Sequence, residues 1–149
     1  MRFADLTQPA LTRDNLVEQL FVALPGQRER FDAESWQYEQ PNGTYGYYGV
    51  VEEYLTRGCI VPAITGGDDS DLGPACRFVE RMLASDDDEV AGAAALSVGE
   101  PLGLTGVELA RALFAADGVT LAVKDLVWPF ASSARGAPDE WRAGRRPFS

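Results

Sequence analysis

Apolar residues recur at intervals of three and four along most of this chain, which is the spacing expected of amphipathic helices. The pattern predicts a first helix over residues 16–24 and a second, more charged helix over residues 27–39. A turn signal at residues 41–43 precedes a third apolar stripe, and the helix that carries this stripe is predicted to end at Gly58. Residues 59–67 are then predicted to form a short apolar connector.

Two acidic groups, each followed by an apolar helical stripe, organise residues 68–102. This arrangement predicts a helix, a short turn and a second helix. Asp71 is placed to cap the first helix, and the second is predicted to begin at residues 87–88 and to end at Pro101 and Gly103. Alanine and glycine are frequent in the second helix, so a neighbouring helix can pack closely against it.

The last third of the chain gives weaker signals. Thr105 and Glu108 have the spacing of a capping box, which predicts the start of another helix. Residues 119–134 fit both a strand-like alternation and a helical spacing, and in an otherwise helical chain they are predicted to form a helix. Residues 135–149 carry four arginines against two acidic residues, and they are expected to stay loosely ordered or to fold back onto the acidic groups.

These elements together predict an all-α fold. We expect six or seven short helices, arranged as a bundle or as a short HEAT-like stack of helix hairpins. A chain of 149 residues fits one domain, so we assign a single helical domain to residues 1–134 and a basic tail to residues 135–149.

The charge of the chain limits its partners. Its formal net charge is −10, with 23 acidic against 13 basic residues, which disfavours nucleic acids and anionic membranes as partners. A basic protein would be attracted, although such a charge also serves simply to keep a protein soluble. The N-terminal residues lack the apolar core of a signal peptide, and no apolar run reaches the roughly 18 residues of a membrane span, so we expect a cytoplasmic protein.

No catalytic constellation is visible in the sequence. The chain has no histidine, which removes the commonest general base and metal ligand, and it has no phosphate-binding glycine loop. Cys59 and Cys76 lie on apolar helical faces and are predicted to be buried reduced thiols rather than metal ligands. We therefore expect no enzyme activity, no cofactor and no bound metal. Catalysis by carboxylates, alone or with Mg²⁺, is the remaining enzymatic alternative.

The candidate partner-binding residues are acidic or aromatic. Carboxylates at helix starts stabilise the helix dipole, so structural capping is the alternative to a role in binding. Tyrosine and tryptophan are frequent anchors at interfaces, and Tyr45 and Tyr48 lie off the apolar stripe of their helix whereas Tyr47 fits it. The full candidate set is Asp68, Asp69, Asp71, Asp86, Asp87, Asp88, Glu89, Trp36, Tyr45 and Tyr48. Among the acids, the turn at residues 86–89 is the preferred contact.

Two segments, residues 16–31 and 76–102, resemble a family of small acidic helical proteins from bacteria, mostly described as a domain of unknown function. The matching elements are Leu24-Pro25, Phe78 with Glu80, Ser85-Asp86-Asp87, and the run from Ser97 to Leu102. Proteins of this kind often occur as immunity-like partners of bacterial toxins. The resemblance implies a helical binding protein, and it supplies no catalytic residues.

We therefore expect an immunity protein that binds a basic bacterial toxin and occludes the active site of that toxin. Attraction between charges would bring the two proteins together, and aromatic side chains would anchor the complex. The alternative is a non-catalytic structural or adaptor protein of a bacterial assembly.

Overall fold

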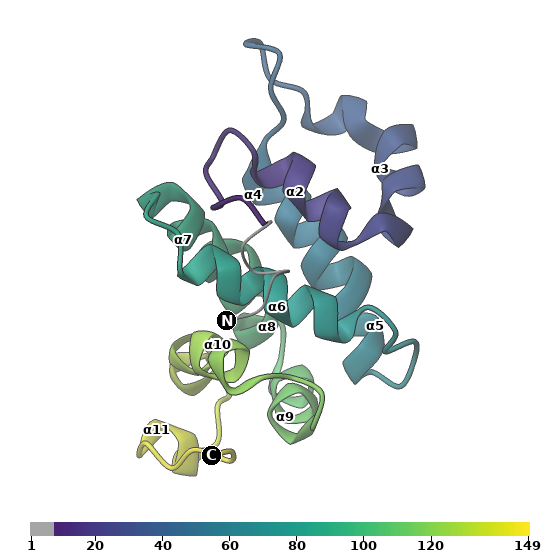
Figure 1. The fold of residues 1–149 in the computed structure, drawn as a ribbon. Helices are drawn as coiled ribbons and strands as arrows, with labels where there is room; N and C mark the ends of the chain where they lie inside the picture. The colour runs from purple at the N-terminus through teal and green to yellow at the C-terminus, as the bar shows by residue number, and fades with distance from the viewer. Residues whose placement is uncertain (1–7) are drawn as a thin grey trace.

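The computed structural model describes residues 8–149, which form eight helices and no β-strand (Figure 1). The predicted all-α class is confirmed for this part of the chain. One antiparallel bridge, between Glu39 and Tyr45, closes the hairpin loop at residues 39–46. Residues 1–7, which belong to the predicted domain, lie outside the described residues.

The first three helices lie between residues 16 and 64. They are α2 (Leu16–Ala23), then the run η1 (Pro25–Gln27), α3 (Arg28–Glu34) and η2 (Ser35–Tyr38), and then the run α4 (Tyr47–Val50), η3 (Val51–Ile60) and α5 (Val61–Ile64). The other five are α6 (Leu72–Leu83), the run α7 (Asp88–Ala94), η4 (Ala95–Gly99) and α8 (Glu100–Leu104), then α9 (Val107–Ala115), α10 (Leu121–Ser133) and α11 (Asp139–Arg142).

The predicted helix end at Gly58 is wrong, because this helix changes to π-helical pairing and continues. The Val61 N–H donates to the Thr56 carbonyl five residues earlier, and the helix passes Gly58 and the predicted connector to reach Ile64. The helix that begins with α7 also contains a π-helical segment, η4, and it ends at Leu104, one residue after the predicted end at Gly103. Wider pairing of this kind occurs as bulges inside α-helices. A proline has no N–H, so the carbonyl four residues before it lacks its usual donor.

The two π-helical segments meet in the core. Pro101 has no N–H to give to the Ser97 carbonyl four residues before it, and the Thr56 hydroxyl donates to that oxygen at 2.7 Å. The Ser97 hydroxyl in turn donates to the Tyr48 carbonyl at 2.8 Å. Both hydroxyls are almost fully buried, and the bond from Thr56 gives the Ser97 carbonyl the donor that Pro101 lacks.

Small residues allow α10 to lie directly against η4 and α8, as the prediction of close packing required. A Cβ atom at Gly99 would lie 2.9 Å from the Leu126 carbonyl oxygen, and one at Gly103 would lie 2.6 Å from Cβ of Phe130. Any larger residue at these two positions therefore forces the helices apart. The predicted helix within residues 119–134 is confirmed as α10, and it accommodates Pro129 in its interior.

Helix capping follows the prediction at only one of three positions. Asp71 precedes α6 as predicted, but its side chain accepts no capping hydrogen bond. The capping box is wrong, because Gly106 precedes α9 and the Thr105 hydroxyl donates backwards to the Pro101 carbonyl. Only Asp87 caps its helix through its side chain.

The C-terminal tail differs most from the prediction. Residues 139–142 form α11, and Trp141 is 4% exposed with its ring 5.4 Å from that of Phe114. Arg146 pairs with Asp125 on α10 and not with either acidic group. The aromatic side chains of the tail decide this outcome, because burying one large aromatic stabilises the fold by about 2 kcal/mol or more.

Helices from the first to the last of the described chain contribute buried apolar side chains to the core. Leu16, Leu20 and Leu24 are fully buried, as the first stripe predicts, and Cys59 and Cys76 are buried free thiols. No single helix in the described chain is long and apolar enough to cross a bilayer. Asp88–Leu104 and Val107–Ala115 reach the required length only as a pair, which is bent by 110°.

Candidate functional site

The turn between α6 and α7, residues 85–89, is built around Asp87 and is called the α7 turn below. Asp87 has an extended backbone and its Oδ1 accepts the Glu89 N–H at 3.0 Å, so it is a true N-cap. The Ser85 hydroxyl accepts the Asp87 N–H at 3.0 Å and donates to the Leu11 carbonyl at 2.6 Å. The turn is thereby attached to the segment that precedes α2.

Arg13 holds the carboxylate of Asp87 from the other side. Its backbone N–H and its Nε donate to Oδ2 at 2.8 and 3.1 Å, and its Nη2 donates to Oδ1 at 2.8 Å. These hydrogen bonds from Arg13, followed by the bond from the Glu89 N–H, lower the pKa of Asp87 to about 2. The carboxylate is therefore charged under all ordinary conditions, and both of its oxygens are engaged within the protein.

Glu89 is engaged in a similar way by two tyrosines. The hydroxyls of Tyr47 and Tyr48 donate to Oε2 of Glu89 at 3.0 and 3.3 Å. Burial is the main cause that raises the pKa of Tyr47 to about 12, and the hydrogen bond to Glu89 is the next. Burial and the Glu89 charge raise the pKa of Tyr48 as well. Both phenols stay protonated and act as donors to this carboxylate.

Two of the four predicted carboxylates of the α7 turn thus hold the fold together, and two are free to meet a partner. Asp86 and Asp88 are exposed and form no ion pair among residues 8–149. Sequence reasoning could not separate the two pairs, because it does not show that Arg13 and the two tyrosines converge on alternate positions of the turn.

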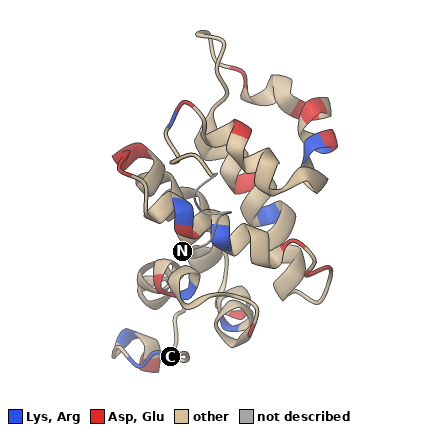
Figure 2. Ribbon diagram, viewed as in Figure 1, with Lys and Arg blue, Asp and Glu red and all other residues tan. Residues whose placement is uncertain are grey.

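The second acidic group, Asp68, Asp69 and Asp71, is called the α6 loop cluster below. It precedes α6 while the α7 turn follows it, and a helix of 12 residues separates the two by roughly 18 Å. Figure 2 shows the two acidic groups at opposite ends of α6. Asp68 accepts only from Ser70, two residues away, and this local turn lowers its pKa. The structure therefore does not bring the two predicted acidic groups together.

The predicted aromatic residues are also divided. Trp36 is 70% exposed, whereas Tyr45, Tyr47 and Tyr48 are all half-buried. The expected contrast between Tyr47 and the other two tyrosines is therefore wrong. Tyr48 shares the acceptor of Tyr47, and the Tyr45 ring packs edge-on against Phe31 at 5.1 Å.

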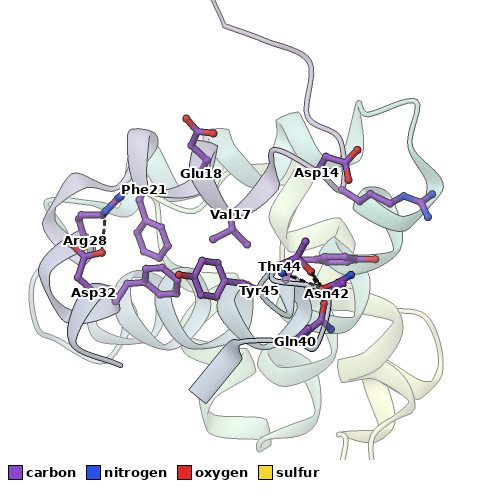
Figure 3. Close-up of a pocket in the computed structure, with 13 residues that line it drawn as sticks. Asp14, Val17, Glu18, Phe21, Arg28, Asp32, Gln40, Asn42, Thr44 and Tyr45 are labelled. Carbon is purple, nitrogen blue, oxygen red and sulfur yellow. Dashed lines mark hydrogen bonds and ion pairs between the residues drawn. The ribbon is translucent and has the colours of Figure 1, made fainter. Parts of the chain in front are cut away.

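A groove that the sequence did not reveal lies beside the α7 turn, between α2, α3 and the hairpin loop. Its volume is about 400 Å³, within the range of sites that hold small ligands. Figure 3 shows Asp14 and Glu18 along one rim, the Arg28–Asp32 pair at one end, and Gln40, Asn42 and Thr44 at the other. The wall between them is apolar and aromatic; it is made by Val17, Phe21, Phe31, Tyr45 and Tyr47. We call this feature the aromatic groove.

The acidic rim of the aromatic groove had a signal in the sequence. Asp14 and Glu18 are four residues apart at the start of the first helix, so they lie on one helical face. Both are exposed and neither forms an ion pair within residues 8–149. The aromatic wall had no such signal, because Phe31 and Tyr45 come from separate elements that meet only in the fold.

The site combines charged side chains on its rim with an apolar and aromatic wall. In the part of the chain that the structure describes, no three side chains of the types that ligate metals are gathered into one group. Comparison of the chain with protein-family models, with curated proteins and with solved structures finds no match. The function has therefore to be argued from the α7 turn and the aromatic groove themselves.

Proposed function

We propose that this protein binds a basic protein partner through the α7 turn and the adjoining rim of the aromatic groove. One observation carries the proposal: the exposed acids Asp86 and Asp88 flank Asp87, whose charge Arg13 balances, and the exposed Asp14 follows Arg13 directly in the chain. Arg13 brings Asp14 close to the α7 turn, because its backbone N–H and its guanidinium both bind Asp87. Glu18 lies along the same rim of the aromatic groove as Asp14 (Figure 3). Negative charge at this face accelerates the arrival of a basic partner and orients it.

The biological form of this interaction that we favour is immunity to a bacterial toxin. An immunity protein acts by occupying the active site of the toxin, which needs a rigid acidic surface and no chemistry of its own. Asp87 and Glu89 supply the rigidity, because they fix the turn that presents the exposed acids. A cytoplasmic location is part of the same proposal.

The test is the rate of association with the purified product of the neighbouring gene, measured at low and high salt. For Asp86→Lys/Asp88→Lys we expect the on-rate at low salt to fall by roughly tenfold or more, because local charge controls steering. The matched control is Asp68→Lys/Asp69→Lys, which changes the net charge equally at the far end of α6. Equal effects of the two double variants, or an on-rate that ignores salt, would contradict the proposal.

A structural or adaptor role is the second candidate, and the exposure of Trp36 favours it. A tryptophan that is 70% exposed offers a large apolar contact surface. In that role the Trp36→Ala variant loses its partner while the Asp86→Lys/Asp88→Lys variant keeps it. The immunity role predicts the opposite order.

A further inference from the structure

The aromatic groove combines an apolar wall with a charged rim. The rings of Phe21 and Phe31 stack with their centroids 4.4 Å apart, and Tyr45 meets Phe31 edge-on. Phe21 and Phe31 are almost fully buried, so they are held in place by the core, whereas Tyr45 is half-buried and reaches the groove. The wall is therefore preformed, and Tyr45 supplies its accessible aromatic surface beside a cavity of about 400 Å³.

The charge of the groove is negative although two arginines line it. Arg28 pairs with Asp32 at 3.2 Å, and Arg13 is held by three hydrogen bonds to Asp87. Both guanidinium charges are thus balanced by carboxylates of the same molecule. Asp14 and Glu18 are left on the rim without an ion-pair partner in residues 8–149.

We propose that the aromatic groove receives one arginine side chain of the protein partner. The guanidinium plane stacks on the half-buried ring of Tyr45, and Asp14 and Glu18 balance its charge from the rim. This inference rests on the proposed function, since it names the partner residue that enters beside the α7 turn.

Arginine fits this groove better than the other side chains. Its guanidinium is planar and weakly hydrated, so it stacks on aromatic rings and gives up water more easily than a lysine ammonium. It also carries five N–H donors, and the far end of the groove offers side-chain oxygens of Gln40, Asn42 and Thr44. An anionic or purely apolar group would meet the uncompensated acids of the rim.

The experiment titrates the isotope-labelled full-length chain with the blocked tripeptide Gly-Arg-Gly at low salt and follows it by NMR. We expect saturable shifts at Val17, Tyr45 and Tyr47. The same peptide with lysine should bind more weakly, and the peptide with neutral norleucine should leave these signals unchanged. In the Asp14→Asn/Glu18→Gln variant we expect the arginine peptide to bind roughly three- to tenfold more weakly, because two exposed charge contacts with the guanidinium are lost.

The control variant Asp69→Asn/Glu108→Gln removes the same charge from two exposed positions outside the groove. It should bind the arginine peptide as the wild type does. Equal binding of the arginine and lysine peptides, equal loss in both double variants, or shifts confined to the α6 loop cluster would overturn the proposal. The peptide experiment does not involve the toxin, so a salt-independent association with the neighbouring gene product would refute the proposed function and leave the groove result standing.

Discussion

The α7 turn and the α6 loop cluster look alike in the sequence and differ in the structure. Each is a run of carboxylates that is followed directly by an apolar helical stripe. In the α7 turn, Asp87 caps its helix and binds Arg13, which lies 74 residues earlier in the chain. In the α6 loop cluster, Asp68 binds only Ser70, and Asp71 caps no N–H group. One group joins distant segments and the other is a solvated loop.

This contrast shows that the density of acidic residues does not decide their role. What decides it is the set of groups that the fold places opposite them. Arg13, Tyr47 and Tyr48 meet alternate carboxylates of the α7 turn, which fixes its backbone and leaves Asp86 and Asp88 pointing to solvent as a defined pair. A carboxylate in a fixed turn loses less conformational entropy on binding than one in a loose loop.

The largest expected effect follows from removing the cap. In Asp87→Ala, the Glu89 N–H loses its acceptor and Arg13 loses its partner, so we expect the melting temperature to fall by roughly 4–8 °C. Asp71→Ala removes no capping bond, and its melting temperature should stay within about 2 °C of the wild type. Thermal unfolding followed by circular dichroism measures both.

The variant Asp87→Asn separates the contribution of the helix cap from the contribution of the ion pair with Arg13. Its side-chain oxygen can still accept the Glu89 N–H, but its charge no longer holds Arg13. We expect its melting temperature to lie between those of the wild type and Asp87→Ala. Equal melting temperatures for Asp71→Ala and Asp87→Ala would show that the α7 turn is no more integrated than the α6 loop cluster.

Local patterns were sufficient to predict the all-α class, because they reflect burial along single helices. The stripe at Leu16, Leu20 and Leu24 predicts a buried face, and the structure has it. The helix end was harder to predict at Gly58, where tertiary contacts override the local preference to stop. The Thr56 hydroxyl that replaces a missing donor for Ser97 comes from another helix, and no local pattern contains that information.

The candidate site was less predictable than the fold. The acidic residues are visible in the sequence, and so is the start of α7 at Asp87. The partition into bound and free carboxylates depends on Arg13 and on Tyr47 and Tyr48, which are far away in sequence. The aromatic groove depends on three separate segments that meet only after folding. Whether these surfaces bind a basic partner stays a prediction.

Acid provides a second, smaller way to test the contrast. The pKa of Asp87 is lowered to about 2 from an ordinary value of 3.8, so its folded state favours the charged carboxylate. A lowered folded pKa stabilises the protein above the unfolded value, and this contribution is lost as the pH falls through the folded value. The difference in melting temperature between the wild type and Asp87→Asn should therefore shrink progressively from about pH 5 to about pH 2.

Asp68 gives the matched control for this acid effect. Its pKa is also lowered, but the cause is the hydroxyl and N–H of Ser70 two residues away. A turn between residues two apart also forms in the unfolded chain, so it lowers the pKa of Asp68 in the folded and the unfolded state alike. Asp68→Asn should therefore follow the wild type across the same pH range. A pH-dependent difference as large as that of Asp87→Asn would show that the Asp68 turn forms only on folding.

The smallest expected effect concerns the tyrosines that hold Glu89, which have no counterpart in the α6 loop cluster. In Glu89→Gln the amide oxygen still accepts a hydroxyl, but the negative charge that disfavours a phenolate is gone. The pKa of Tyr47 should therefore fall from about 12 and remain above its ordinary value of 10.0, because burial is the larger cause of the shift. Ultraviolet titration of the phenol measures this midpoint, and the Tyr47→Phe variant assigns it. Asp69→Asn should leave the titration unchanged, whereas an unaltered midpoint in Glu89→Gln would mean that the two tyrosines do not sense the charge of the α7 turn.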